Sequence, residues 1–177
     1  MKKLNVGVVG ATRMVGQKYV SLLEDHPWFQ VAHLSDSTRS AGITYAQAVA
    51  GRWMMSEPLP EGVAKLIVHD AADVAVAQES CHLVIKALAM EKSAVGVLEE
   101  RYAAAGLPVI SNNSAHRHSA DVPVLIPEIN PHHAAMIPSS GREKNRARTQ
   151  KKSRLRLQRD VSFMEIRSST APGLSCW

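Results

Sequence analysis

The chain has 177 residues, enough for one ordinary domain with either a tail or a fragment of a second domain. Hydrophobic residues make up 45% of it, which suffices for a buried core, yet no apolar stretch reaches the roughly 20 residues that span a bilayer. Two cysteines are too few for a disulfide framework, so we expect a soluble, cytoplasmic protein without a membrane partner. The net charge is +5.

Strand and helix patterns alternate along most of the chain. A β-branched run at residues 4–9 predicts a buried strand, and apolar spacing at 14–26 predicts the helix that follows it. Further strands are predicted at 29–34, 65–69, 81–88 and 107–111, with a short helix after the third strand and a helix at 91–105. Residues 112–131 show no clear period. The alternation predicts an α/β fold, a Rossmann-type doubly wound parallel sheet with right-handed crossovers.

A glycine-containing segment, residues 10–16, lies between the first predicted strand and the first predicted helix. Gly10 permits a tight turn there, and Gly16 lets the helix pack close to the sheet. Free backbone N–H groups and the positive end of the helix then favour a pyrophosphate. We therefore predict a dinucleotide site at this turn. The alternative is a purely structural turn.

The end of the second predicted strand indicates which dinucleotide binds. An acidic residue there suits the ribose hydroxyls of NAD, whereas an arginine suits the 2′-phosphate of NADP. The chain has both, Asp36 and Arg39, with hydroxyl side chains around the arginine. Because a guanidinium flanked by serines can hold a phosphate through charge-assisted hydrogen bonds, we favour NADP and leave NAD open. The alternative is a solvated polar loop.

Five separated segments carry a family resemblance. They read VGVVGATRMVGQ at 6–17, DHPWF at 25–29, RSAG at 39–42, SNNSAHR at 111–117 and IPEINP at 126–131. In this order they resemble aspartate-semialdehyde dehydrogenase of the archaeal and fungal branch, and the resemblance covers residues 4–137. Related acyl-phosphate and acyl-thioester reductases share the architecture and remain alternatives.

The resemblance implies an oxidoreductase that uses NADPH to reduce L-aspartyl-4-phosphate to L-aspartate 4-semialdehyde, for lysine, threonine and methionine biosynthesis. In that family a cysteine attacks the acyl phosphate, a histidine acts as the base, and hydride from the nicotinamide releases the aldehyde. The family enzyme is oligomeric, which implies a homo-oligomer or pairing with full-length subunits. The implied cofactor-binding residues are Gly10, Thr12, Arg13, Met14, Val15 and Gly16 at the pyrophosphate, Ser37, Arg39 and Ser40 at the 2′-phosphate, and Asn112 near the nicotinamide.

Three departures from the family pattern bear on binding and turnover. The family has glycine where Arg13 stands; if this position has a positive φ, the side chain strains the turn by about 1–2 kcal/mol, and we expect weakened binding unless its charge contacts the phosphate. Lys86 replaces a serine at the end of the fourth strand, where it lies beside the cofactor or points to solvent. The Asn-Pro-x-Cys segment expected downstream of Pro131 does not follow, nor does the histidine-bearing catalytic domain. We therefore expect a domain truncated before the catalytic cysteine and inactive alone.

No residue of this chain is predicted to be catalytic or to bind a metal. Cys81 begins a predicted buried strand, and Cys176 lies one residue from the end of the sequence, without a base to activate it. The histidines of the polar segment do not stand with thiolates or carboxylates in a ligand pattern, so we expect solvated loop histidines. They are His116, His118, His132 and His133.

The charge is divided unevenly between two parts of the chain. Residues 138–177 hold 10 basic and 3 acidic residues, a net charge of +7, which leaves 11 basic and 13 acidic residues, a net charge of −2, in residues 1–137. We predict that 1–137 is an NADP-binding Rossmann domain and that 138–177 is a basic tail, disordered or read out of frame. The alternative is a nucleic-acid-binding or regulatory interaction protein that uses the tail, and we favour the first interpretation.

Overall fold

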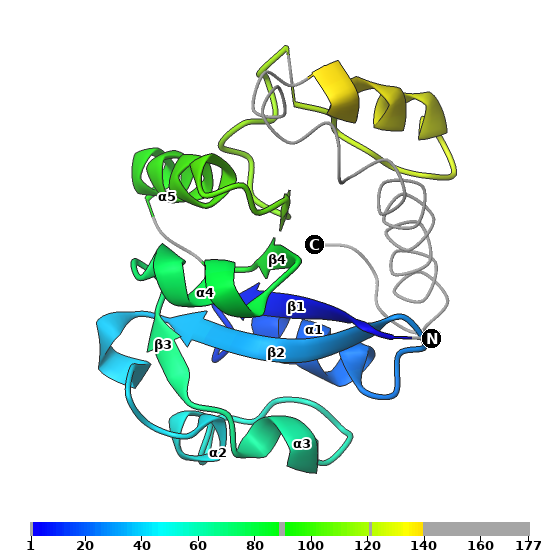
Figure 1. The fold of residues 1–177 in the computed structure, drawn as a ribbon. Helices are drawn as coiled ribbons and strands as arrows, with labels where there is room; N and C mark the ends of the chain where they lie inside the picture. The colour runs from blue at the N-terminus through cyan, green and yellow to red at the C-terminus, as the bar shows by residue number, and fades with distance from the viewer. Residues whose placement is uncertain (1, 89–90, 121, 140–177) are drawn as a thin grey trace. The chain divides into compact units, whose positions relative to one another are not determined.

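A single parallel sheet of five strands organises the N-terminal part of the chain (Figure 1). The computed structural model describes residues 2–88, 91–120 and 122–139. The strands are β1 (Leu4–Val9), β2 (Phe29–Asp36), β3 (Val68–Asp70), β4 (Leu83–Lys86) and β5 (Val109–Ser111). Their order is β3-β2-β1-β4-β5, with every pair parallel. The chain thus moves outward from β1 to β3 and returns to the other side of β1, which confirms the predicted doubly wound Rossmann-type sheet.

Helices connect the strands and cover both faces of the sheet. They are α1 (Met14–Leu23), α2 (Tyr45–Ala48), α3 (Glu61–Ala64), α4 (Val74–Ser80) and α5 (Lys92–Ala104), with 3₁₀ turns η1 (Thr38–Ser40) and η2 (Pro131–Ser139). In Figure 1, α4 and α5 pack on one face and α1 on the other. Right-handed crossovers require this arrangement. The connection through α1 moves along the sheet from β1 to β2, whereas the connections through α4 and α5 move in the opposite direction, to β4 and then to β5.

The core lies between the sheet and its helices. Val6, Val8 and Val9 of β1 are completely buried, as expected for a central parallel strand that is covered on both faces. On the side of α4 and α5, the buried apolar residues form one cluster that consists of Val9, Ala71, Ala77, Val84, Leu88, Leu98, Tyr102 and Leu107. This packing fixes the positions of the strand ends, which carry the candidate site.

Element boundaries differ from the predicted ones where local geometry interrupts the apolar pattern. The first helix ends at Leu23 rather than at 26, because Glu24 adopts an extended conformation (ψ 133°) and Asp25 then has a left-handed φ of 53°. The third strand is Val68–Asp70 rather than 65–69, since Lys65 ends α3 in a helical conformation. Cys81 follows α4 and lies outside β4, whereas it was predicted to begin that strand. The helix predicted at 91–105 is α5, which ends at Ala104 with Ala105 as its C-cap, and Gly106 follows with φ +80°.

The chain divides into two compact units, Met1–His116 and a second unit that begins at Arg117. In the second unit, the Asn130 side chain organises a turn, accepting from Ile126 N at 2.6 Å and donating to Val124 O at 2.8 Å. Residues 140–177 lie outside the described residues, and with them most of the predicted tail. Within the described ranges, none of the helices combines the length and apolar character that crossing a membrane requires.

Candidate functional site

The turn between β1 and α1 is possible only with glycine at two positions. Gly10 has φ +90°, and a Cβ built on it lies 2.5 Å from the backbone nitrogen of Leu88. A Cβ built on Gly16 lies 2.1 Å from the carbonyl oxygen of Gly10. Both distances are far below a van der Waals contact. The two glycines therefore let the first turn of α1 pack against the end of β1, where neither position has room for a side chain; we call this turn, residues 10–16, the glycine cradle.

Hydrogen bonds to the end of β2 hold this turn in place. The backbone N–H groups of Gly10 and Ala11 donate to the Ser35 carbonyl at 2.7 and 3.2 Å. Thr12 donates from its backbone nitrogen and its hydroxyl to Asp36 Oδ2, at 2.9 and 2.7 Å. The other carboxylate oxygen of Asp36 accepts from Ser37 N at 2.7 Å. Asp36 is 3% exposed, so this carboxylate is a buried acceptor that holds the turn through hydrogen bonds.

Two further buried side chains support the turn, and sequence reasoning assigned neither of them a role. Gln17 donates to the carbonyls of Thr12 and Arg52, both at 2.9 Å, and accepts from Met54 N at 2.8 Å. The Tyr45 hydroxyl donates to the Ala11 carbonyl at 2.8 Å. Burial first, and the charge of Asp36 second, raise the pKa of Tyr45, so the hydroxyl keeps its proton and remains a donor.

The N-terminus of α1 lies within this cradle, with Met14 as the first helical residue. An α-helix leaves its first N–H groups without intrahelical partners, and in the described part of the chain no side chain caps them here. Arg13 precedes the helix with φ −93° and ψ 162°, an extended conformation that any residue adopts. Arg13 therefore does not have the positive φ that would strain the turn. Arg13, Met14 and Val15 are all exposed around the helix end, where an anion is favoured.

The residues predicted to contact a 2′-phosphate follow β2 at the same edge of the sheet. Ser37 and Arg39 are exposed, while Ser40 is buried at 6% exposure and closes η1 by donating its N–H to the Ser37 carbonyl at 3.0 Å. Arg39 thus lies exposed in a short 3₁₀ turn that directly follows β2. Ser40 contributes to the shape of that turn.

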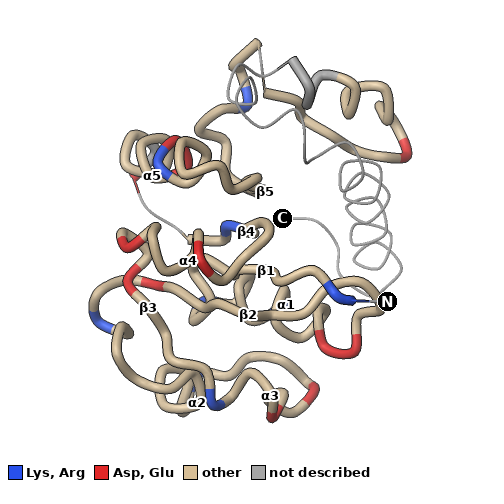
Figure 2. The backbone as a smooth tube through the Cα atoms, viewed as in Figure 1, with Lys and Arg blue, Asp and Glu red and all other residues tan. Residues whose placement is uncertain are grey.

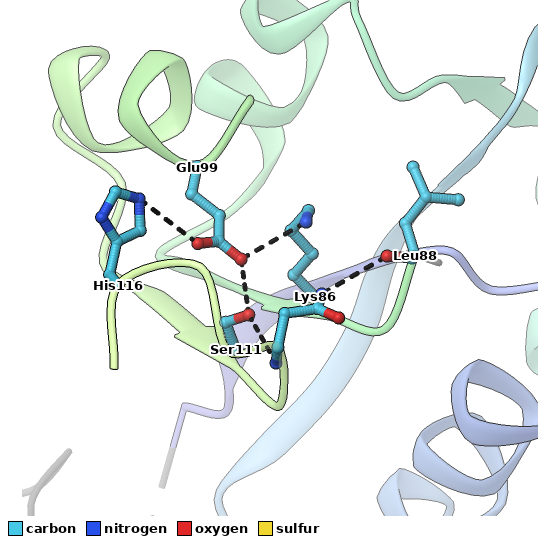
Figure 3. A network of polar contacts seen from close by, with 6 residues as sticks. Lys86, Leu88, Glu99, Ser111 and His116 are labelled. Carbon is cyan, nitrogen blue, oxygen red and sulfur yellow. Dashed lines mark hydrogen bonds and ion pairs between the residues drawn. The ribbon is translucent and has the colours of Figure 1, made fainter. Parts of the chain in front are cut away.

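A second polar cluster lies on the opposite side of β1, at the ends of β4 and β5 (Figure 3). Lys86 is completely buried, and its Nζ lies 3.3 Å from Glu99 Oε1 on α5. The interpretation that Lys86 points to solvent is therefore wrong: the carboxylate of Glu99 supplies the partner that makes its burial possible. Burial lowers the pKa of Lys86, and the charge of Glu99 opposes that shift. Asn112 is exposed directly after β5.

Cys81 is in an unreactive environment. Its side chain packs against the cluster of α4 and α5, next to Gly7 of β1. Burial raises the pKa of the thiol, which lowers the fraction present as the nucleophilic thiolate. Cys176 lies outside the described residues.

The described histidines enter other contacts. His116 Nε2 lies 3.5 Å from Glu99 Oε2, and His133 Nδ1 lies 3.0 Å from the carbonyl oxygen of Val124. Over the described ranges, no group of three or more His, Cys, Asp or Glu side chains is arranged to hold a metal ion. Figure 2 shows that Lys and Arg residues are interspersed with Asp and Glu residues over the labelled helices and strands.

The fold and the turn together define a dinucleotide-binding domain of the Rossmann type. Residues 5–137 match the family described as "Semialdehyde dehydrogenase, NAD binding domain", and the chain belongs to that family.

Individual relatives agree with this assignment. Aspartate-semialdehyde dehydrogenase of Cryptococcus neoformans is 37% identical over 136 residues, which are 77% of this chain and 36% of that protein. Malonyl CoA reductase (NADP) of Metallosphaera sedula is 34% identical over 136 residues, again 77% of this chain and 36% of the relative. The crystal structure of the Candida albicans aspartate-semialdehyde dehydrogenase with NADP aligns with a TM-score of 0.66 and 33% identity, over 76% of this chain and 36% of that one. The chain thus spans about a third of the length of these relatives.

Proposed function

We propose that residues 1–137 form the NADP-binding domain of an aspartate-semialdehyde dehydrogenase. The observation that carries this proposal is the close approach of α1 to β1 at Gly10 and Gly16, which brings a helix N-terminus without a side-chain cap from Arg13 to the end of the central strand. The N–H groups of this helix end and the side chains of Thr12 to Val15 would surround the pyrophosphate. Ser37, Arg39 and Ser40 would form the 2′-phosphate site, and Asn112 would lie near the nicotinamide.

The preference for NADP over NAD follows from the way in which Asp36 is used. An acidic residue that selects NAD must offer a carboxylate oxygen to the ribose hydroxyls. Here both carboxylate oxygens of Asp36 already accept hydrogen bonds from the protein: Oδ2 accepts two from Thr12, and Oδ1 accepts one from Ser37 N. Arg39, by contrast, is exposed one turn further along and can form a charge-assisted pair with a phosphate.

The reaction of the whole enzyme is part of the same proposal. The protein to which this domain belongs would reduce L-aspartyl-4-phosphate to L-aspartate 4-semialdehyde with NADPH. We expect no turnover from this chain alone, because the thiol of Cys81 is held in an apolar environment that disfavours the thiolate. Pairing with full-length subunits and a cytoplasmic location complete the proposal.

Titration of the full chain with NADP⁺ and NAD⁺ by isothermal calorimetry tests the cofactor assignment. We expect NADP⁺ to bind at least about tenfold more tightly than NAD⁺, since one charge-assisted phosphate contact is worth about that factor. Arg39→Gln should remove this difference by weakening NADP⁺ binding alone. Lys65→Gln makes the same charge change at an exposed position before β3 and should leave both affinities unaltered. Absence of binding at millimolar NADP⁺, or tighter binding of NAD⁺, would contradict the proposal.

A further inference from the structure

The buried ion pair between Lys86 and Glu99 is one part of a chain of polar contacts that reaches the surface. Glu99 Oε1 also accepts from the Ser111 hydroxyl at 2.5 Å, and Glu99 Oε2 lies 3.5 Å from His116 Nε2 (Figure 3). Glu99 is 5% exposed, whereas Ser111 and the following Asn112 are exposed. The carboxylate of Glu99 thus joins a buried lysine to a surface turn.

The strand register places this network on the far side of β1 from Arg39. Val9 is paired with Ser35 on one side and with Lys86 on the other, and Lys86 is paired in turn with Ser111. These residues form one row along the carboxyl edge of the sheet, where doubly wound folds bind their ligands. A dinucleotide with its 2′-phosphate at Arg39 and its pyrophosphate at α1 must extend its other half along this row towards β4 and β5.

The Ser111 hydroxyl connects Glu99 to the turn that follows β5, because it also accepts a hydrogen bond from that turn. It accepts from Asn113 N at 3.1 Å, and Asn113 Nδ2 donates to the Leu88 carbonyl at 3.3 Å. Leu88 is also the residue whose backbone lies against Gly10. The contacts therefore run from Glu99 through Ser111 and Asn113 to the wall of the glycine cradle, and Asn112 is held between two anchored neighbours.

We propose that Glu99, acting through the Ser111 hydroxyl, is a positioning residue that fixes the turn at 111–113 for the nicotinamide half of the dinucleotide. This inference rests on the proposed function. Lys86 supplies the counter-charge that allows the Glu99 carboxylate to be buried beneath the turn, and Ser111 is the link between the carboxylate and the surface. Without that link the turn would sample other conformations, and the affinity would fall with the fraction that remains competent.

Two ligands separate this role from a general structural one. NADP⁺ carries the nicotinamide half, whereas 2′,5′-ADP carries only the adenosine half with its 2′-phosphate. In the full chain, Ser111→Ala should weaken NADP⁺ binding by about tenfold and leave 2′,5′-ADP binding within about twofold. Ser111→Thr keeps the hydroxyl and should restore the affinity for NADP⁺.

Variants of Glu99 test the buried part of the network. Because Glu99→Gln leaves Lys86 without its counter-charge, the pair is also replaced together, as Lys86→Met with Glu99→Leu, which removes both buried charges. Each variant that melts as cooperatively as the wild type should lose NADP⁺ affinity selectively, as Ser111→Ala does. Glu100→Gln alters the neighbouring, exposed glutamate and should change neither affinity.

The outcomes distinguish the two claims. If the wild type binds both ligands and Ser111→Ala weakens both equally or neither, the positioning role is wrong while the NADP site stands. If the wild type binds neither ligand, the proposed function is overturned and the positioning role with it.

Discussion

Gly16 is the residue at which the candidate site is least tolerant of change. Its Cβ would stand 2.1 Å from the carbonyl oxygen of Gly10, a residue whose N–H donates to the Ser35 carbonyl at 2.7 Å. We predict that Gly16→Ala destabilises the protein by at least about 2 kcal/mol, as overpacking against rigid backbone does, and abolishes NADP⁺ binding. Urea unfolding and calorimetric titration measure the two effects.

Gly62→Ala is the matched control for this change. Gly62 lies in α3 and a Cβ built on it meets no atom within 4 Å. Alanine should therefore leave NADP⁺ binding intact and raise stability by about 0.5–1 kcal/mol through its helix propensity. Equal effects of the two substitutions would show that the close approach of α1 to β1 is not what the turn requires.

His33 makes stability depend on pH. It is 2% exposed, and its ring stacks on His69 with centroids 5.0 Å apart. Burial first and the charge of His69 second lower its pKa from 6.5 to about 4, and Asp73 opposes the shift. The unfolded chain therefore takes up a proton at a higher pH than the folded one. The resulting stability is fully present above pH 6.5 and is lost as pH falls towards 4, by about 3 kcal/mol in total.

Urea unfolding at a series of pH values from about 7.5 down to about 4.5 measures this loss. His33→Phe keeps a ring in the stack and removes the titrating group, so its free energy of unfolding should fall less steeply over this range. His118→Gln removes an exposed histidine and should retain the wild-type slope. A slope that is the same in His33→Phe and the wild type would rule out His33 as the source.

At the scale of elements, the β1–turn–α1 unit was predictable because all of its determinants are local. The β-branched run, the two glycines and the apolar helix spacing lie within residues 4–23, and each specifies the same structure. The helix boundary at Leu23 and the extended conformation of Arg13 were not predictable. Both depend on backbone angles that composition leaves open.

The sequence pattern predicted no helix between β2 and β3, where the structure has α2 and α3. The helices α2 and α3 have four residues each, too short for a helical period to appear. In α2, reciprocal hydrogen bonds between Thr44 and Gln47 cap the N-terminus, whereas the N-terminus of α3 has no side-chain cap from Pro60. A sequence search for capping boxes would have indicated α2.

The candidate site likewise has a part that the sequence predicts and a part that it does not. Its glycines are recognisable from the strand–turn–helix context, but the partners of its polar groups come from distant positions. Asp36 supports the turn from 24 residues beyond Thr12, and Glu99 pairs with Lys86 across 13 residues. Only the folded sheet and its packing against α5 bring such residues together, so the sequence left open whether Asp36 binds a ribose and whether Lys86 lies beside the cofactor or points to solvent.

At the scale of the whole molecule, the sheet should open from its edges. β1 is hydrogen-bonded to strands on both sides, and Val6, Val8 and Val9 are completely buried. β3 and β5 have three residues each and lie at the two ends of the strand order. Exposure of β1 amides therefore requires loss of the core, whereas those of the outer strands can be exposed by local opening.

Native-state hydrogen exchange with mass spectrometry measures this order directly. We predict that amides of residues 6–9 exchange slowest, with a free energy close to that of global unfolding, and that peptides covering 68–70 and 109–111 exchange through smaller openings. Saturating NADP⁺ should slow exchange at 10–16 and at 109–113, because the ligand would bridge the centre of the sheet to β5 and so oppose opening of that edge. Residues 68–70 serve as the internal reference, since β3 lies beyond β2 at the other end of the strand order. Protection of 109–111 equal to that of β1 in the free protein would show that the sheet opens as one unit and that the β5 edge is not an independent element.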